Sequence, residues 1–455
     1  MAAYRQALAL KQDHPEAHMN LGVALMEQGK STDAIEQYDR ALKLRPDFAE
    51  AHMNLAIALQ KGGRSEEAVP HYERALALRP TYVAALMNFG HALLELSRLD
   101  DALARYEQAL VVRSGNTGSH LLGASPLDSV RKGSNATRAL QPLEEQCFMS
   151  LVRVNCWRSG ARHWAELCAI ALAQGGLLPP SRYELLVRAA IGQWIADDRA
   201  GLVRTLDQAQ AISTAIGAST SRDVKNSRAY EKYLGNLLPH AAEKVVAPDE
   251  SVPALPVIGD SHCLAYHGVA AMLDGRRHVA NARLVMGCKA WHLSNSRPNL
   301  YKWLFAQLLD QVPENSPAIC CFGEIDCRLD EGILSHYRKV GGDLETMIAG
   351  QVDAYVAHIG QAAVPRRIAP LFMNVPAPHL DLLDPQHPEV SSADKALLID
   401  IVRMFNRSLA VAAARGGYRV IDLFQLSAGP QGRASGERHI DDFHLKPDSL
   451  SLALS

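Results

Sequence analysis

Small, apolar and polar residues recur along the first quarter of the chain with a step of 34 positions. The segment Ala-His-Met-Asn-Leu begins at Ala17 and again at Ala51, and the related segment Ala-Leu-Met-Asn-Phe begins at Ala85. A second set of positions, made of alanines and tyrosines, keeps the same step: Ala34, Ala68 and Ala102; Tyr38, Tyr72 and Tyr106; Ala41, Ala75 and Ala109. A fixed period of this length predicts an array of stacked repeats.

The period and its small, aromatic and proline positions resemble the tetratricopeptide repeat, over about residues 1–116. The residues suit two helices per unit, because small side chains let the helices approach closely and the tyrosine fills the gap between them. Pro46 and Pro80 end the second helix of the first two units. Tyr4 and Ala7 match the second helix of a preceding unit, so we expect the array to begin in the middle of a repeat.

Asparagine occupies one position of the first helix in all three units, as Asn20, Asn54 and Asn88. Stacking of the units would align these side chains as a ladder of amides, which can donate to and accept from the backbone of an extended chain. The pattern resembles the asparagine ladder of repeat arrays attached to glycosyltransferases and implies a protein or peptide partner. The alternative is that these amides brace neighbouring helices.

The repeat pattern ends before a second region, residues 117–250. Residues 114–119 are turn-forming, and residues 119–140 carry little periodicity and predict a loop. Residues 141–242 have helical apolar spacing without a clear repeat. Residues 246–253 hold two prolines and acidic residues, which places a domain boundary there.

Short apolar runs alternate with longer amphipathic segments in the third region, residues 251–455. The predicted strands are 255–258, 282–286, 318–322, 368–374 and 418–424. The predicted helices are 262–273, 301–311, 344–361 and 393–415. Alternation of strands and helices predicts an α/β domain with a parallel sheet, whose ligands bind beyond the carboxyl ends of the strands.

The composition is that of a globular protein. The chain is 48% hydrophobic and 21% charged with a formal net charge of −2, which is ordinary for a globular protein and gives no sign of a nucleic-acid or membrane partner. No apolar run approaches the roughly 18 residues of a membrane helix, and the N-terminus lacks the pattern of a signal peptide. The eight cysteines include no CxxC pair, and the adjacent Cys320 and Cys321 lie in an apolar run. This pattern favours buried thiols and a cytoplasmic location.

Two short motifs supply the residues of a nucleophilic site. Ser261 follows an apolar run in the segment Gly-Asp-Ser-His, and Asp441 precedes His444 by three residues near the end of the chain. A serine hydroxyl becomes a good nucleophile when an imidazole takes its proton. A carboxylate on the other ring nitrogen fixes the tautomer of that imidazole. Without catalysis, Ser261 would be a helix N-cap and His444 a histidine of a surface loop.

The two motifs resemble the first and last blocks of the SGNH (GDSL-like) hydrolases. The resemblance implies a three-layer α/β fold in which Ser261 is the nucleophile, His444 the general base and Asp441 its orienting residue, with no metal and no cofactor. The backbone N–H of Ser261 would help to hold the oxyanion, and Gly287, after the second predicted strand, is a candidate second donor. The implied function is ester hydrolysis or acyl transfer on a small ester, such as an acetyl group on a glycan.

The third block of that family departs from its pattern here. The family ends a strand with Gly-x-Asn-Asp, whereas this chain has Ile325 two residues after Gly323. Loss of the asparagine amide removes an oxyanion donor, and one such donor is worth about 10²–10³ in rate. Asn374, after the next strand, is a candidate substitute. Arg328 could bind an anionic group or the oxyanion, or could form a salt bridge with Asp326 or Glu324.

Two other functions stay open. Asp260 and His262 match the first block of the metallophosphoesterases and could hold a divalent cation, although the chain has no Gly-Asn-His and no His-x-His segment. The other alternative is a non-catalytic repeat scaffold that carries a degraded hydrolase domain.

Overall fold

The computed structural model divides the chain into two compact units. Residues 1–159, 166–182 and 298–300 form the first unit, and residues 160–165, 183–297 and 301–455 form the second. The structure describes residues 2–114, 142–173, 176–219, 221–243, 252–328, 332–383, 391–429, 432–434, 436–441 and 443–455. The predicted loop at 119–140, nearly all of the turn-forming segment 114–119 and most of the predicted boundary at 246–253 lie outside the described residues.

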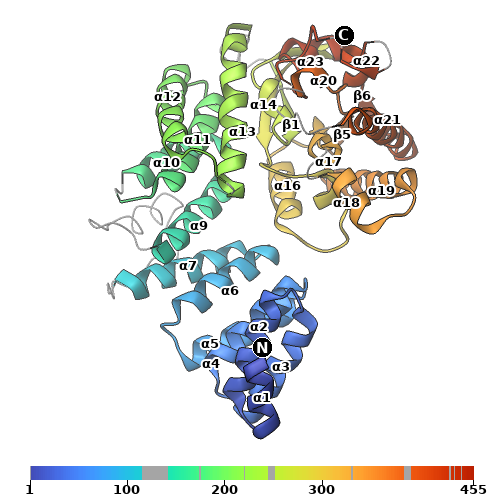
Figure 1. Ribbon diagram of the computed structural model, residues 1–455. Helices are drawn as coiled ribbons and strands as arrows, with labels where there is room; N and C mark the ends of the chain where they lie inside the picture. Colours follow the sequence, from blue (N-terminus) through green and yellow to red (C-terminus); the bar gives the residue numbers. More distant parts are fainter. Residues whose placement is uncertain are drawn as a thin grey trace. The chain divides into compact units, whose positions relative to one another are not determined.

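Helix pairs in the first unit follow the predicted period (Figure 1). A single helix, α1 (Ala2–Leu10), precedes three pairs: α2 (Pro15–Glu27) with α3 (Ser31–Leu44), α4 (Ala49–Lys61) with α5 (Ser65–Leu78), and α6 (Val83–Glu95) with α7 (Leu99–Ser114). Pro46 and Pro80 come just after the residues that cap α3 and α5, as predicted. Further along the chain, α9 (Pro142–Ser159) packs against α7, and Arg158 forms a 3.2 Å ion pair with Asp100.

The packing within a pair explains the repeated small residues. A Cβ atom on Gly22 would lie 2.5 Å from the Tyr38 ring, and one on Gly90 would lie 2.6 Å from the Tyr106 ring. Real carbon atoms do not approach so closely, so glycine is required for these tyrosines to lie flat against the partner helix. The tyrosines are fully buried and fill the space between the two helices of each pair, as predicted.

Helices of the predicted middle region open the second unit. The elements are η1 (Ala161–His163), α10 (Trp164–Leu172), α11 (Pro179–Ile195), α12 (Arg199–Ile216), α13 (Arg222–Leu237) and η2 (Leu238–Glu243), of which α10 and α11 both span the division between the units. Trp194 on α11 donates from its indole N–H to the Leu264 carbonyl at 2.8 Å, which joins this helix to the α/β part of the unit.

The sheet of the second unit is mixed rather than wholly parallel as predicted, because its edge strand forms a hairpin. Its strands are β1 (Ala254–Gly259), β2 (Ala270–Leu273), β3 (Arg276–Leu284), β4 (Pro317–Cys321), β5 (Ala369–Met373) and β6 (Arg419–Ile421), in the order β2-β3-β1-β4-β5-β6. Only β2 is antiparallel to its neighbour; the other described pairs are parallel. The helices around it are α14 (His262–Ala265), α15 (Ala290–Ser294), α16 (Leu300–Asp310), α17 (Glu324–Cys327), α18 (Ile333–Val340), α19 (Leu344–Ala363), η3 (Val364–Arg366), α20 (Leu380–Leu383), α21 (Ser392–Arg415), α22 (Leu423–Ser427) and α23 (Asp448–Leu454).

One predicted helix is wrong. Residues 262–273 were expected to be helical, but α14 ends at Ala265 and the edge strand β2 follows it. Gly268, with φ of +78°, turns the chain, and Asp274 and Gly275 both have positive φ values in the tight turn between β2 and β3. Asp-Gly is a strong hairpin signal, and it outweighs the apolar spacing before it.

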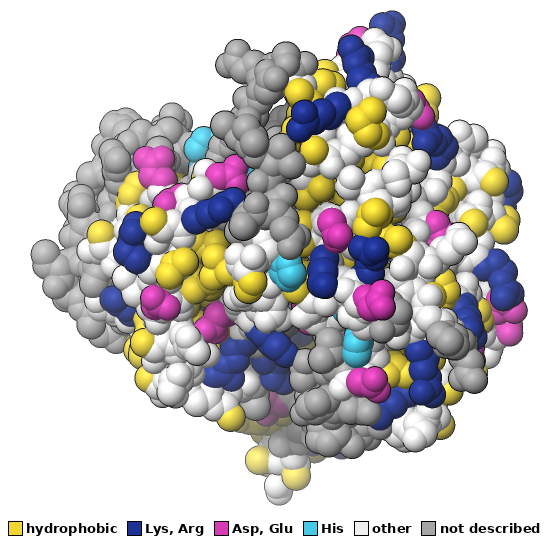
Figure 2. Space-filling model, turned by 90° about the horizontal axis from the view of Figure 1, so that it is seen from above, with side chains coloured by type: hydrophobic (Ala, Val, Ile, Leu, Met, Phe, Trp, Pro, Cys, Tyr) yellow, Lys and Arg dark blue, Asp and Glu magenta, His cyan; other side chains and the backbone are white. Residues whose placement is uncertain are grey.

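The charged side chains and the cysteines are distributed as the low net charge and the apolar setting of Cys320 and Cys321 suggest. Figure 2 shows acidic and basic side chains interspersed on the face that it presents. All eight cysteines are buried and free, as expected of Cys320 and Cys321. Among the described residues, no helix is both long enough and apolar enough to span a bilayer.

Candidate functional site

Ser261 lies just beyond the carboxyl end of β1, where the sheet reverses its order. The neighbours of β1 are β3 on one side and β4 on the other, so the chain leaves β1 toward one edge and later crosses to the opposite side. Such a switch point opens a crevice for ligands. Gly259 permits the close approach of β1 and β4 there, because a Cβ atom on it would lie 2.3 Å from the carbonyl oxygen of Cys321.

Ser261, His444 and Asp441 are in hydrogen-bond contact. The Oγ atom of Ser261 lies 2.9 Å from Nε2 of His444, and Nδ1 of His444 lies 2.8 Å from both carboxylate oxygens of Asp441. Oδ1 of Asp441 also accepts from the backbone N–H groups of Phe443 and His444. Because an ionised carboxylate only accepts hydrogen bonds, the proton of the neutral imidazole sits on Nδ1, and Nε2 is free to accept the serine proton.

The surroundings of these three residues suit that chemistry. Burial alone would raise the pKa of Asp441, but the charge that His444 carries when protonated and the hydrogen bonds to His444 and Phe443 hold it well below its usual range. Ser261 makes no capping hydrogen bond at the start of α14, so the N-cap alternative does not describe its side chain. His444 is 6% exposed and therefore is not a surface-loop histidine.

A second histidine, His262, lies beside the first. Its Nδ1 atom is 3.2 Å from Oδ1 of Asp260 and 3.9 Å from Oε2 of Glu324, and its Nε2 atom is 3.3 Å from the Phe443 carbonyl oxygen. Burial lowers the pKa of His262, but the hydrogen bond and charge of Asp260, with the charge of Glu324, raise it to about 9. Both nitrogens face acceptors, so His262 is a buried imidazolium.

The side chains that could bind a metal ion at this site already form hydrogen bonds within the protein. His262, Glu324 and His444 each offer one ligand atom, and these atoms lie within 4.8 Å of one another. However, both nitrogens of His262 donate to protein acceptors. The Glu324 carboxylate accepts hydrogen bonds from Arg328, from Nε at 2.6 Å and from Nη2 at 3.0 Å. Burial would raise the pKa of Glu324, yet the charges of Arg328 and the two histidines lower it. The donor set therefore fits an ion-pair network better than a metal site.

Three side chains of the segment after β4, those of Ile325, Asp326 and Arg328, have different surroundings. The Arg328 guanidinium forms the salt bridge with Glu324 that was one of the two expectations for it. Asp326 accepts from the backbone N–H groups of Ala290 (2.7 Å) and Trp291 (3.0 Å) and from the Gln351 amide, and burial raises the pKa of Asp326 to about 6. Ile325, which stands where the SGNH pattern has asparagine, is buried.

The two candidate oxyanion residues, Asn374 and Gly287, lie in different surroundings. The amide of Asn374 donates to Asp422 at 2.7 Å, and its oxygen accepts from the N–H groups of Leu423 and Phe424 at the start of α22. These contacts use both ends of the Asn374 amide. Gly287 has φ of +71° and lies near the hydroxyl of Tyr230.

Sequence reasoning missed the contribution of α13. The Tyr233 ring stacks on the His444 ring with a centroid distance of 3.8 Å and an angle of 25° between the planes. Tyr230, one turn earlier on α13, reaches Gly287. The sequence carries no local sign of this contact, because the tyrosine precedes its histidine partner by about two hundred positions and sits on a helix without a motif.

Asn20, Asn54 and Asn88 lie on α2, α4 and α6, the first helix of each pair, and all three are partly exposed. The amide of Asn54 approaches the sulfur of Met19 at 3.6 Å. Within the described part of the chain, the amides of Asn20 and Asn88 have no hydrogen-bond partner.

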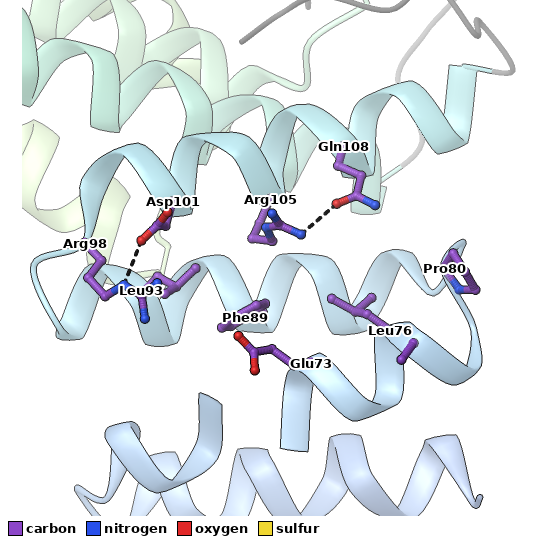
Figure 3. Close-up of a pocket in the computed structure, with 10 residues that line it drawn as sticks. Glu73, Leu76, Pro80, Phe89, Leu93, Arg98, Asp101, Arg105 and Gln108 are labelled. Atoms are coloured by element: carbon purple, nitrogen blue, oxygen red, sulfur yellow. Dashed lines mark hydrogen bonds and ion pairs between the residues drawn. The ribbon is translucent and has the colours of Figure 1, made fainter. Parts of the chain in front are cut away.

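A pocket of about 360 Å³ lies between the second and third helix pairs (Figure 3). Leu76, Phe89 and Leu93 contribute apolar surface, and Arg98 and Arg105 lie on the opposite wall. Each arginine is held by a residue of α7 three positions further along the chain, Arg98 by Asp101 and Arg105 by Gln108. The pocket therefore combines apolar and charged walls of balanced sign.

Comparison with known proteins identifies the repeats. Residues 2–47 and 23–83 match one tetratricopeptide repeat family and residues 59–112 match another. Similar solved structures include pilF of Pseudomonas aeruginosa (20% identity; 50% of this chain and 84% of that chain; TM-score 0.35) and MamA (20%; 35% and 88%; 0.25). Another is YrrB, a tetratricopeptide repeat protein with an unusual peptide-binding site (17%; 46% and 92%; 0.32). No curated protein matches the chain. The predicted repeats are thus confirmed, and arrays of this kind are typical of protein-interaction scaffolds.

Proposed function

We propose that the second unit is a serine-dependent ester hydrolase or acyl transferase with an SGNH-like fold. The observation that carries the proposal is the chain of contacts from Ser261 Oγ to His444 Nε2 (2.9 Å) and from His444 Nδ1 to Asp441 (2.8 Å). Two sequence motifs about 180 positions apart meet in the geometry that a nucleophile, its base and an orienting carboxylate require.

The reaction uses the proton that these residues share. As Ser261 Oγ bonds to the carbonyl carbon of the ester, Nε2 of His444 takes the hydroxyl proton. The tetrahedral intermediate collapses when the alkoxide leaves with that proton, and the acyl group stays on Ser261. Water or an acceptor hydroxyl then attacks the acyl-serine and gives its proton to Nε2 of His444. His444 passes that proton to Oγ of Ser261 as the bond between Oγ and the acyl carbon breaks, which releases the product and restores the free serine.

Oxyanion stabilisation rests on the backbone in this proposal. Among the described residues, no hydrogen-bond acceptor is paired with the N–H of Ser261, so it is available to the developing negative charge. Gly287, at the carboxyl end of β3, is the candidate second donor. The side-chain amide of the SGNH pattern is replaced by Ile325, so we expect slower turnover than a complete oxyanion hole would give.

The substrate class follows from the resemblance and from one surface feature. The acyl group is a small one, such as acetyl, carried by a glycan. Trp291 supports this choice, because the residue is 47% exposed on α15, just after Gly287, and its backbone is held by buried Asp326. An exposed indole offers an apolar face with a polar edge, which suits the C–H face of a sugar ring.

The second candidate function is a non-catalytic scaffold. The tetratricopeptide repeats favour it, since their amide ladder would bind the backbone of a partner whether or not the second unit turns over. In both functions Asn20, Asn54 and Asn88 recruit a protein or peptide partner.

One experiment separates the two functions. The full-length protein, Ser261→Ala and the control Ser294→Ala are assayed on short-chain nitrophenyl esters and with a fluorophosphonate serine probe. Wild type and Ser294→Ala should hydrolyse acetate esters and take up the probe, and Ser261→Ala should do neither. Folded wild-type protein that shows neither turnover nor labelling would overturn the hydrolase proposal and leave the scaffold.

A further inference from the structure

Tyr233 is a buried aromatic residue on the face of the candidate general base. It belongs to α13, a helix that precedes the sheet in the chain, and its side chain is 3% exposed. Its ring stacks on His444 at 3.8 Å. The His262 ring also lies near His444, with a centroid distance of 4.4 Å and an interplanar angle of 32°.

Stacking supplies a restraint that hydrogen bonds in the ring plane lack. Asp441 and Ser261 hold the two nitrogens of His444 along its edge. Those bonds tolerate a tilt of the ring out of plane, and a tilt turns the Nε2 lone pair away from the serine hydroxyl. A flat ring in contact with the imidazole face opposes that tilt. The electron-rich face of the tyrosine also attracts the imidazolium that forms when His444 takes the proton.

We propose that Tyr233 is a positioning residue for His444, so that helix α13 belongs to the catalytic apparatus of the second unit. The inference rests on the proposed function of Ser261 and His444. The ring carries the role rather than the hydroxyl, since among the described residues the Tyr233 hydroxyl is buried with no hydrogen-bond partner.

The test compares three variants of the full-length protein. Tyr233→Phe keeps the ring, Tyr233→Leu removes it, and Tyr355→Leu is the matched control. Tyr355 is also a buried tyrosine of the second unit without a hydroxyl partner in the described part of the chain, but its ring packs edge-on against Phe322 and Phe372 and not on His444. Both leucine variants lose a similar buried volume, so their melting temperatures should fall alike.

The expected result is a selective loss of kcat. Tyr233→Leu should lower kcat by about tenfold to 10²-fold, the range that a misplaced catalytic group produces, with little change in KM. Tyr233→Phe should stay within about twofold of wild type, and Tyr355→Leu should keep its kcat despite its lower melting temperature. Equal kcat values in the two leucine variants would overturn the proposal and make Tyr233 an ordinary core residue.

A substrate-free readout keeps the two proposals distinguishable. The Nδ1–H proton of His444, held by Asp441, should give a downfield proton resonance in wild type and Tyr233→Phe that is lost in Asp441→Asn. Loss or broadening of this resonance in Tyr233→Leu supports positioning even if no ester is turned over. An unchanged resonance in Tyr233→Leu would refute positioning even if wild type is an active esterase.

Discussion

The imidazole rings of His262 and His444 lie 4.4 Å apart, centroid to centroid, but their nitrogens face different groups. Both nitrogens of His262 face acceptors, whereas Nε2 of His444 faces the hydroxyl of Ser261. One histidine is therefore held as a cation, and its neighbour is arranged to carry a proton back and forth.

The buried His262 cation predicts a loss of stability in alkaline solution. The pKa of His262 is about 9 in the folded state against an ordinary 6.5, so its contribution is complete below about pH 6.5 and disappears as the pH rises through 9. The free energy of unfolding should fall by about 3 kcal/mol across this window. Urea unfolding of wild type and His262→Asn at pH 6 and pH 10 measures it. An equal pH dependence in the two proteins would contradict the assignment.

Removal of the orienting carboxylate should cost turnover more than binding. Asp441→Asn presents a hydrogen-bond donor where Nδ1–H needs an acceptor, which favours the wrong tautomer of His444 and should lower kcat by up to about 10⁴-fold. Steady-state kinetics on a short-chain ester give kcat and KM separately. The control is Asp448→Asn, a partly exposed carboxylate paired with Arg438, which should behave as wild type. A variant that loses only affinity would argue against Asp441 as the orienting residue.

Ester hydrolysis should not require a metal ion. The ligand atoms of His262 and Glu324 are already hydrogen-bonded within the protein, so dialysis against a chelator should leave kcat unchanged. The measurement is activity before and after chelation, with manganese and zinc added back. Activity that is lost and then restored by either metal would favour the metallophosphoesterase alternative.

The amide ladder predicts a separation of partner binding from catalysis. Replacing Asn20, Asn54 and Asn88 together by alanine should weaken capture of the partner, because the backbone contacts are lost, and leave hydrolysis of a small ester unchanged. Pull-down of the partner measures capture by the triple variant, and steady-state kinetics on a small ester measure its hydrolysis. A large drop in melting temperature would instead show that the amides brace the helices.

Close packing in the third repeat predicts the sign of a glycine substitution. Gly90→Ala forces a methyl group into the ring of Tyr106 and should destabilise the protein by about 1–3 kcal/mol. Gly235→Ala on α13 meets nothing within 4 Å and should be stabilising by about 0.5–1 kcal/mol, because alanine loses less conformational freedom in a helix. Thermal unfolding of both variants gives the comparison; a neutral Gly90→Ala would show that the helix pair can separate without cost.

The features that could be predicted from the sequence are those that a local pattern of residues encodes. The repeat helices follow from a period that sets neighbouring contacts, and the Asp441 and His444 pair follows from a spacing of three residues. The β2 edge strand was missed because apolar spacing was weighed above the Asp-Gly turn at Asp274. The stacking of Tyr233 was missed because it depends on how a helix docks on the sheet, which no local pattern encodes.

The burial of every cysteine gives each unit its own chemical reporter of opening. Cys147, Cys156 and Cys168 belong to the first unit, and Cys263, Cys288, Cys320, Cys321 and Cys327 belong to the second. A thiol reagent can modify such side chains only while the surrounding structure is transiently open. The rate at which peptides from each group gain mass would therefore compare the opening of the repeat array with that of the sheet in a single intact molecule, with no tag or mutation.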